Sequence, residues 1–97
     1  MMIHVTLKPH ATLTEVFGRG SMTISVPEGA TVREVLALAI GRLQEDFVQR
    51  YGLQGAQELL QSSVLLLNGV HHLKPEALGV KVKEGDQIEI HAPLAGG

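Results

Sequence analysis

The sequence predicts an α+β domain in which a mixed sheet of four to five strands carries one long helix on one face. Two alternating apolar runs at the start of the chain predict a hairpin, and a stretch with helical spacing follows them. Further apolar runs then return the chain to the sheet. This order places the helix across one face of the sheet and leaves the opposite face open.

Length and composition restrict the class of protein. The 97 residues are 44% hydrophobic and 19% charged, as expected of a single folded domain spanning residues 1–97. The net charge of -2, with scattered Lys and Arg, argues against nucleic acid as a partner. The lack of cysteine excludes a disulfide, a thiolate zinc site and a cysteine nucleophile. No apolar run approaches the roughly 18 residues of a membrane span. No signal peptide is apparent, so we expect a cytoplasmic protein without a membrane partner.

The first two strands follow from alternation of apolar and polar residues. One is predicted before Pro9 and the other over residues 22–26. Residues 10–20 are expected to form a long connection that Gly18 and Gly20 close. We expect the two strands to pair as an antiparallel hairpin.

The clearest local signal is a helix start at Thr31. Thr31 and Glu34 form a capping box, in which each side chain can bond an otherwise unpaired backbone N–H. The spacing predicts a helix over about residues 31–46, with Gly41 inside it. Its apolar stripe is interpreted as core and consists of Val32, Val35, Leu36, Ala39, Ile40, Leu43 and Phe47.

The segment 48–63 gives the weakest signal in the chain. Tyr51-Gly52 and Gly55 are predicted to be breaks, and residues 56–60 could form a short helical turn. No function is assigned to this segment.

The last third of the chain predicts a return to the sheet. The apolar run at residues 64–67 is typical of an interior strand, and Asn68-Gly69 is a strong hairpin turn signal. Residues 71–73 are expected to form a short return strand ended by Lys74-Pro75. A last strand, with Ile88 and Ile90 facing inward, leads into the final residues.

The open face of the sheet is expected to be polar with one apolar interruption. An apolar residue on such a face indicates a docking surface. The expected contributors are His4, Thr6, Thr23, Ser25, Glu89, His91 and at least one leucine of the 64–67 run.

Two motifs carry a family resemblance. Leu66-Leu67-Asn68-Gly69 is similar to a "VNG" strand end and turn, and the Gly85-Asp86 turn is followed by a strand and by Pro93-Leu94-Ala95-Gly96-Gly97. With this order of elements, the chain resembles the MoaD/ThiS family of ubiquitin-like sulfur carriers, and most closely MoaD, the small subunit of molybdopterin synthase. The resemblance implies a β-grasp fold with a flexible tail at residues 92–97. The family usually has Arg where this chain has Thr14, so no partner contact is assigned to that loop.

The resemblance also implies a reaction at Gly97. A ubiquitin-activating-type adenylyltransferase would use MgATP to adenylate the Gly97 carboxylate. A sulfur donor such as a cysteine desulfurase or rhodanese would then convert it to a thiocarboxylate. The large subunit of molybdopterin synthase would accept this end, with sulfur passing to a pterin precursor. Gly96, Ala95, Leu94 and Pro93 would bind the partner, because an end without side chains can enter a narrow slot.

The chain itself is expected to be a carrier and not an enzyme, without a bound cofactor or metal. His71-His72 lacks a third ligand at useful spacing, and neighbouring strand residues point apart. Glu84-Gly85-Asp86 is interpreted as turn chemistry and not as a pair of catalytic carboxylates.

Three other functions stay open at the level of sequence. The chain could be a thiamine-type sulfur carrier, which its activating enzyme would reveal. It could be a protein modifier whose Gly97 forms isopeptide bonds with lysines. It could also be a β-grasp interaction module, which would tolerate an extra residue after Gly97.

Overall fold

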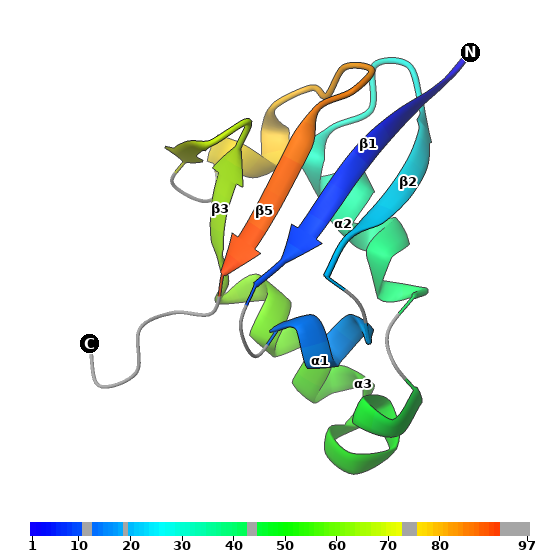
Figure 1. Ribbon diagram of the computed structural model, residues 1–97, viewed down its shortest axis with the longest axis vertical. Coiled ribbons are helices and arrows are strands. Elements are labelled where there is room, and N and C mark those ends of the chain that lie inside the picture. Colours follow the sequence, from blue (N-terminus) through cyan, green and yellow to red (C-terminus); the bar gives the residue numbers. More distant parts are fainter. Residues whose placement is uncertain (11–12, 19, 43–44, 73–75, 92–97) are drawn as a thin grey trace.

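The computed structural model describes residues 1–10, 13–18, 20–42, 45–72 and 76–91 and contains a five-stranded mixed sheet (Figure 1). The strand order across the sheet is β2-β1-β5-β3-β4. β1 and β5 run parallel, whereas the other neighbouring pairs are antiparallel. The predicted α+β class, mixed sheet and hairpin are therefore confirmed. The strands are β1 (Met2–Pro9), β2 (Met22–Pro27), β3 (Val64–Leu67), β4 (Val70–His72) and β5 (Gln87–His91).

Helix α2 (Val32–Ile40) lies across one face of this sheet and closes the hydrophobic core (Figure 1). Every second residue of β1 and β2 is buried, because successive strand side chains point to opposite faces. The most deeply buried large side chains come from the sheet, the first short helix and α2, and are Leu7, Leu13, Ile24, Leu65, Ile88, Ile90, Val5, Val26, Val32 and Val35.

The predicted start of α2 is confirmed, but its predicted end is wrong. Thr31 has extended backbone angles, and its Oγ1 accepts a hydrogen bond of 3.4 Å from the Glu34 N–H. The helix ends at Ile40 and not near residue 46. The N–H groups of Gly41 and Arg42 turn back to carbonyls three residues earlier, which tightens the last turn. The Arg42 guanidinium then donates to the Thr23 carbonyl of edge strand β2 at 2.9 Å.

A short helix, α1 (Leu13–Phe17), occupies part of the segment predicted to be a plain connection. Its two ends, Leu13 and Phe17, are almost fully buried. Their spacing of four residues places both side chains on one side of a single helical turn. Such a short helix is marginal in isolation, so burial against the core stabilises it. Sequence periodicity cannot detect a segment of this length.

Helix α3 (Glu45–Gln61) covers most of the segment 48–63, where the sequence signal is weakest. It is kinked at Gly52. Gly52 has φ 79° and ψ 158°, a conformation that residues with a Cβ rarely adopt. The predicted break at Tyr51-Gly52 is therefore confirmed, whereas Gly55 lies inside the helix. Phe47, which the sequence predicts in the helix that begins at Thr31, belongs to α3 instead. It packs beside the core and against Tyr51, with ring centroids 4.7 Å apart and ring planes tilted by 39°.

The turn between β3 and β4 agrees with the sequence. Asn68 and Gly69 both have positive φ, 52° and 85°, as expected for a tight hairpin turn between β3 and β4. A 3₁₀ turn, η1 (Glu76–Gly79), was not predicted and buries Ala77. The predicted strand at residues 71–73 corresponds to β4, although Leu73 and Lys74-Pro75 lie outside the described residues. Among the described residues, no helix is long and apolar enough to cross a membrane.

Candidate functional site

The residues assigned to the reaction, Gly97, and to partner binding, Pro93, Leu94, Ala95 and Gly96, lie outside the described part of the chain. The structure instead describes the strand that leads into them. β5 lies in the middle of the sheet, between β1 and β3, and its last residue is His91. Hydrogen bonds to neighbours on both sides therefore fix the chain up to this residue.

The open face of the sheet, opposite α2, carries the residues predicted for it. The strand register aligns Thr23 with Thr6 and Thr6 with Gln87. It also aligns Lys8 with Glu89 and Glu89 with Leu66. We define the open face by the outward residues His4, Thr6, Lys8, Thr23, Ser25, Val64, Leu66, Gln87, Glu89 and His91.

Leu66 is the apolar interruption expected on this face. Its neighbour Leu65 is 1% exposed in the core, whereas Leu66 is half-buried and points to the opposite side. The four-residue apolar run is therefore not buried on both faces. Val64, also half-buried, aligns with His91 on the same outer surface. The centre of the open face thus has apolar contact area beside polar groups, a composition suited to a protein interface.

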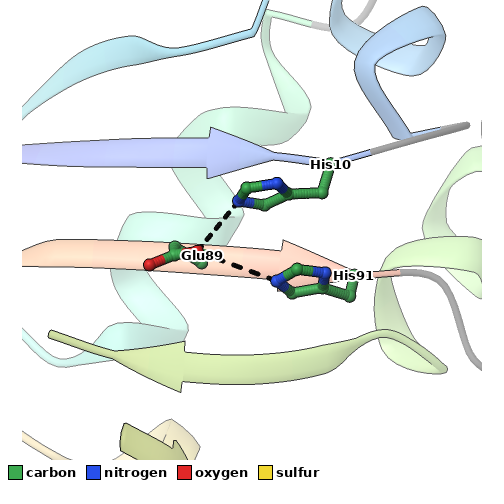
Figure 2. Close-up of side chains that lie close together, drawn as sticks. All are labelled: His10, Glu89 and His91. Atoms are coloured by element: carbon green, nitrogen blue, oxygen red, sulfur yellow. Dashed lines mark ion pairs between the residues drawn. The ribbon is translucent and has the colours of Figure 1, made fainter. Parts of the chain in front are cut away.

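Three polar side chains gather where β1 and β5 end (Figure 2). His10 Nε2 lies 2.9 Å from Glu89 Oε2, and His91 Nε2 lies 3.8 Å from the same oxygen. The two imidazole rings stack with centroids 4.2 Å apart and planes 5° from parallel. The exposed fraction of the Glu89 side chain is 19%, about half that of either histidine.

The parallel register explains this cluster. Pro9 aligns with Ile90, and the His10 N–H donates to the Ile90 carbonyl at 3.0 Å, so the ladder continues one residue past β1. His10 therefore lies beside His91 on the open face. Glu89 and His91 share that face because they are two residues apart in one strand.

Gln87 orients the Glu89 carboxylate. Its side-chain amide donates to Glu89 Oε1 at 3.0 Å, while Oε2 faces the two rings. This hydrogen bond is the main cause of a pKa for Glu89 below its ordinary value. Partial burial acts in the opposite direction, and positive charge on His10 and His91 lowers the pKa further.

The Glu84-Gly85-Asp86 segment forms a turn, as predicted. Asp86 Oδ2 accepts from the Lys83 N–H at 2.7 Å, and Oδ1 accepts from the Asn68 side-chain amide at 3.1 Å. Glu84 accepts from the His4 N–H at the other end of β1. Asp86 therefore bonds to turn partners, and Glu84 bonds to the backbone and ring of His4, so each carboxylate has its own partners and the two do not form a catalytic pair.

His10 is the site residue that the sequence analysis missed, because it was placed in the connection after β1. The available signal was the outward series of His4, Thr6 and Lys8, which His10 continues with a period of two. Pro9 concealed this continuation. Proline is tolerated there because the ladder hydrogen bond comes from the next residue, His10.

Comparison with known proteins agrees with this fold. A family model described as the ThiS family matches residues 10–97. A comparison with curated proteins gives no match.

Several solved structures are similar to the chain. The HVO 2177 protein of Haloferax volcanii has a TM-score of 0.76 and 23% identity, over 99% of this chain and 88% of that chain. Small archaeal modifier protein 1 of H. volcanii has a TM-score of 0.70 and 28% identity, over 95% and 99%. A complex of subunits 1 and 2 of molybdopterin-converting factor from Helicobacter pylori gives a TM-score of 0.58 and 19% identity, over 98% and 100%.

The family match covers all but the first nine residues, and the strand order with a helix across one face is the ubiquitin-like β-grasp arrangement of these neighbours. The chain therefore belongs to the ThiS family and has the fold of the ubiquitin-like sulfur carriers.

Proposed function

We propose that this chain is a cytoplasmic sulfur carrier that acts as the small, non-catalytic subunit of a molybdopterin synthase. Its reactive group would be the Gly97 carboxylate. The observation that carries the proposal is the family match, which runs through β5 and on to Gly97. The likeness to a two-subunit molybdopterin-converting factor supports a large-subunit partner.

The proposed chemistry begins with activation of an inert group. A carboxylate at neutral pH is an anion without a good leaving group. A ubiquitin-activating-type adenylyltransferase would join it to the α-phosphate of MgATP with loss of pyrophosphate. A persulfide on a donor such as a cysteine desulfurase or rhodanese would attack the carbonyl carbon, and AMP would leave. A thiol would then reduce the resulting acyl disulfide, which releases the thiocarboxylate and oxidises the thiol to a disulfide. The product, a thiocarboxylate, is a better nucleophile than the carboxylate.

The fold would contribute positioning. β5 is hydrogen-bonded on both sides, so the segment after His91 begins at a fixed point beside the open face. We infer that the large subunit contacts this face around Leu66, while Pro93 to Gly97 enter its active site. A rigid base beside the docking surface limits the freedom lost when the tail is bound.

The test is the intact mass of the full chain after incubation with its activating enzyme, MgATP and sulfide. We expect a gain equal to the replacement of one oxygen by one sulfur. Deleting Gly97, or adding one residue after it, should abolish the gain. If the mass does not change while the same enzyme modifies a known carrier, the proposal is wrong.

The second candidate is a protein modifier. The 28% identity to small archaeal modifier protein 1, over almost the whole of both chains, favours it. Gly97 would then form isopeptide bonds with lysines of other proteins through the same adenylated intermediate. Lysine adducts carrying the Gly97 end, detected by mass spectrometry in cells and absent after deletion of Gly97, would support this role.

A further inference from the structure

His10, Glu89 and His91 combine ligand types that suit one class of ion. Imidazole nitrogen and carboxylate oxygen together favour divalent transition metals such as Zn²⁺. The ligand atoms of the three side chains all lie within 4.8 Å of one another. Glu89 and His91 lie on β5, and His10 directly follows β1, where its N–H bonds to the Ile90 carbonyl, so the backbone holds the three residues together.

We propose that His10, Glu89 and His91 bind a divalent transition-metal ion of the zinc class. The two Nε2 atoms and Glu89 Oε2 would be the ligands, and a remaining position would be open to water. Three protein ligands with one open position is the pattern of zinc sites that are not purely structural. This inference departs from the sequence-based expectation of no metal, and it does not depend on the sulfur-carrier proposal.

The distances suit tetrahedral coordination. Bonds of about 2.0–2.2 Å from an ion to its ligands require ligand atoms about 3.3–3.6 Å apart. The observed separations from Glu89 Oε2, 2.9 Å to His10 Nε2 and 3.8 Å to His91 Nε2, lie on either side of that range. The two distances from Glu89 Oε2 therefore need to change by only a few tenths of an ångström, and the rings must also rotate to bring both Nε2 atoms onto the ion.

In the described part of the chain, the two Nε2 atoms have no hydrogen-bond partner outside the cluster. Both Nε2 atoms are buried from solvent. Among the described residues, His91 Nε2 has no hydrogen-bond partner, and His10 Nε2 has only its ion pair with Glu89 Oε2 at 2.9 Å. A buried polar atom without a partner is unfavourable, and a bound cation would satisfy both rings. Gln87 adds an outer contact, because its amide holds Oε1 and leaves Oε2 directed at the rings.

Binding requires the rings to leave their stacked arrangement. Two parallel planes cannot both contain the ion, so at least one ring must tilt until the Nε2 lone pairs converge. The torsion about the last side-chain bond of histidine is broad, so this rotation costs little. Loss of ring stacking is therefore a specific signature of metal binding at this cluster.

Lys8 provides a variant that should strengthen binding. It is the aligned neighbour of Glu89 across β1 and β5, on the same face. A positive charge there opposes a bound cation. Lys8→Gln should therefore bind Zn²⁺ several-fold more tightly than the natural chain.

The experiment is a titration of the full-length, metal-free chain with Zn²⁺ by calorimetry, together with imidazole NMR. We expect one ion per chain. Of the five histidines, only His10 and His91 should show large ring shifts and loss of mutual stacking. Shifts confined to other histidines, or no binding, would overturn the inference without the use of any variant.

Variants then assign the ligands. His10→Ala and His91→Ala should each weaken binding by at least about 100-fold, since even outer contacts of metal sites change affinity by 10–100-fold. Glu89→Gln should also weaken it. His4→Ala is the matched control, because His4 on β1 also pairs with a carboxylate, Glu84 at 3.2 Å, but this pair contains no second histidine. Equal losses in His4→Ala and His10→Ala, with circular dichroism unchanged, would disprove a defined site.

Discussion

Glu89 is the residue whose ionisation depends most clearly on a single neighbour. The Gln87 amide bonds to its carboxylate and lowers its pKa. We predict that Gln87→Ala raises the pKa of Glu89 toward its ordinary value, 4.5. Carbon-13 NMR titration of the side-chain carboxyl in metal-free buffer would measure the shift. Gln49→Ala, which removes a similar amide on Glu45 in α3, is the control and should leave Glu89 unchanged.

The lowered pKa of Glu89 determines how its contribution to the free energy of unfolding changes with pH. A carboxyl whose pKa is lower in the folded than in the unfolded state stabilises the fold above its unfolded pKa, near 4.5. That contribution disappears as the pH falls through the folded pKa. The free energies of unfolding of Gln87→Ala and the natural chain should therefore converge at acid pH. A constant difference at all pH values would contradict this account.

Asn68 has both a backbone and a side-chain role in the turn after β3. Its φ of 52° suits asparagine better than alanine. Its Oδ1 accepts from the Gln87 N–H at 2.9 Å, and its amide donates to Asp86. We predict that Asn68→Ala lowers the free energy of unfolding by about 1–2 kcal/mol. Urea denaturation would measure the change.

Asn68→Gly separates the two roles. Glycine tolerates positive φ but has no side chain to form these hydrogen bonds. Asn68→Gly should therefore lower the free energy of unfolding by less than Asn68→Ala. Equal costs for the two variants would mean that the backbone conformation contributes nothing.

At the scale of elements, α2 depends on its N-terminal cap. The Thr31 hydroxyl accepts from the Glu34 N–H, one of the four donors without a partner inside the helix. Thr31→Ala should lower the free energy of unfolding by about 1 kcal/mol, as is typical of a lost cap. Thr31→Ser keeps the hydroxyl and should recover most of this loss. If serine and alanine are equally destabilising in urea denaturation, the hydroxyl is not the cause.

At the scale of the whole molecule, the sheet divides adjacent residues between two environments. Leu65 is buried in the hydrophobic core, whereas Leu66 lies on the open face. Leu65→Ala should lower the free energy of unfolding by about 2–5 kcal/mol, because it leaves a cavity in a packed core. Leu66→Ala should cost much less, because solvent already reaches its side chain. Thermal or urea unfolding of the two variants compares them directly.

The proposed docking of the large subunit on the open face predicts that Leu66 matters more for binding than for stability. Leu66→Ala should weaken docking of the large subunit, which calorimetry would detect with the folded variant. If Leu66→Ala binds as tightly as the natural chain, the open face is not the interface and the tail alone would account for recognition.

The sequence by itself determined the strands, the capped helix start, the Asn68-Gly69 turn and the outward set that includes Glu89 and His91. Each of these depends on neighbours within a few residues, through the period of two in strands, the helical period and local hydrogen bonding. The family resemblance likewise came from short motifs. The family match extends to Gly97, but the reaction at that residue stays a prediction.

Only the tertiary structure decided the end of α2, the formation of α1 and the position of His10. α1 is too short for its pattern to be recognised, and burial of Leu13 and Phe17 stabilises it. His10 meets Glu89 and His91 because β1 pairs in parallel with β5, which is about 80 residues away along the chain. Such a register depends on packing of the whole sheet and not on local sequence, so the cluster can be recognised only in the folded molecule.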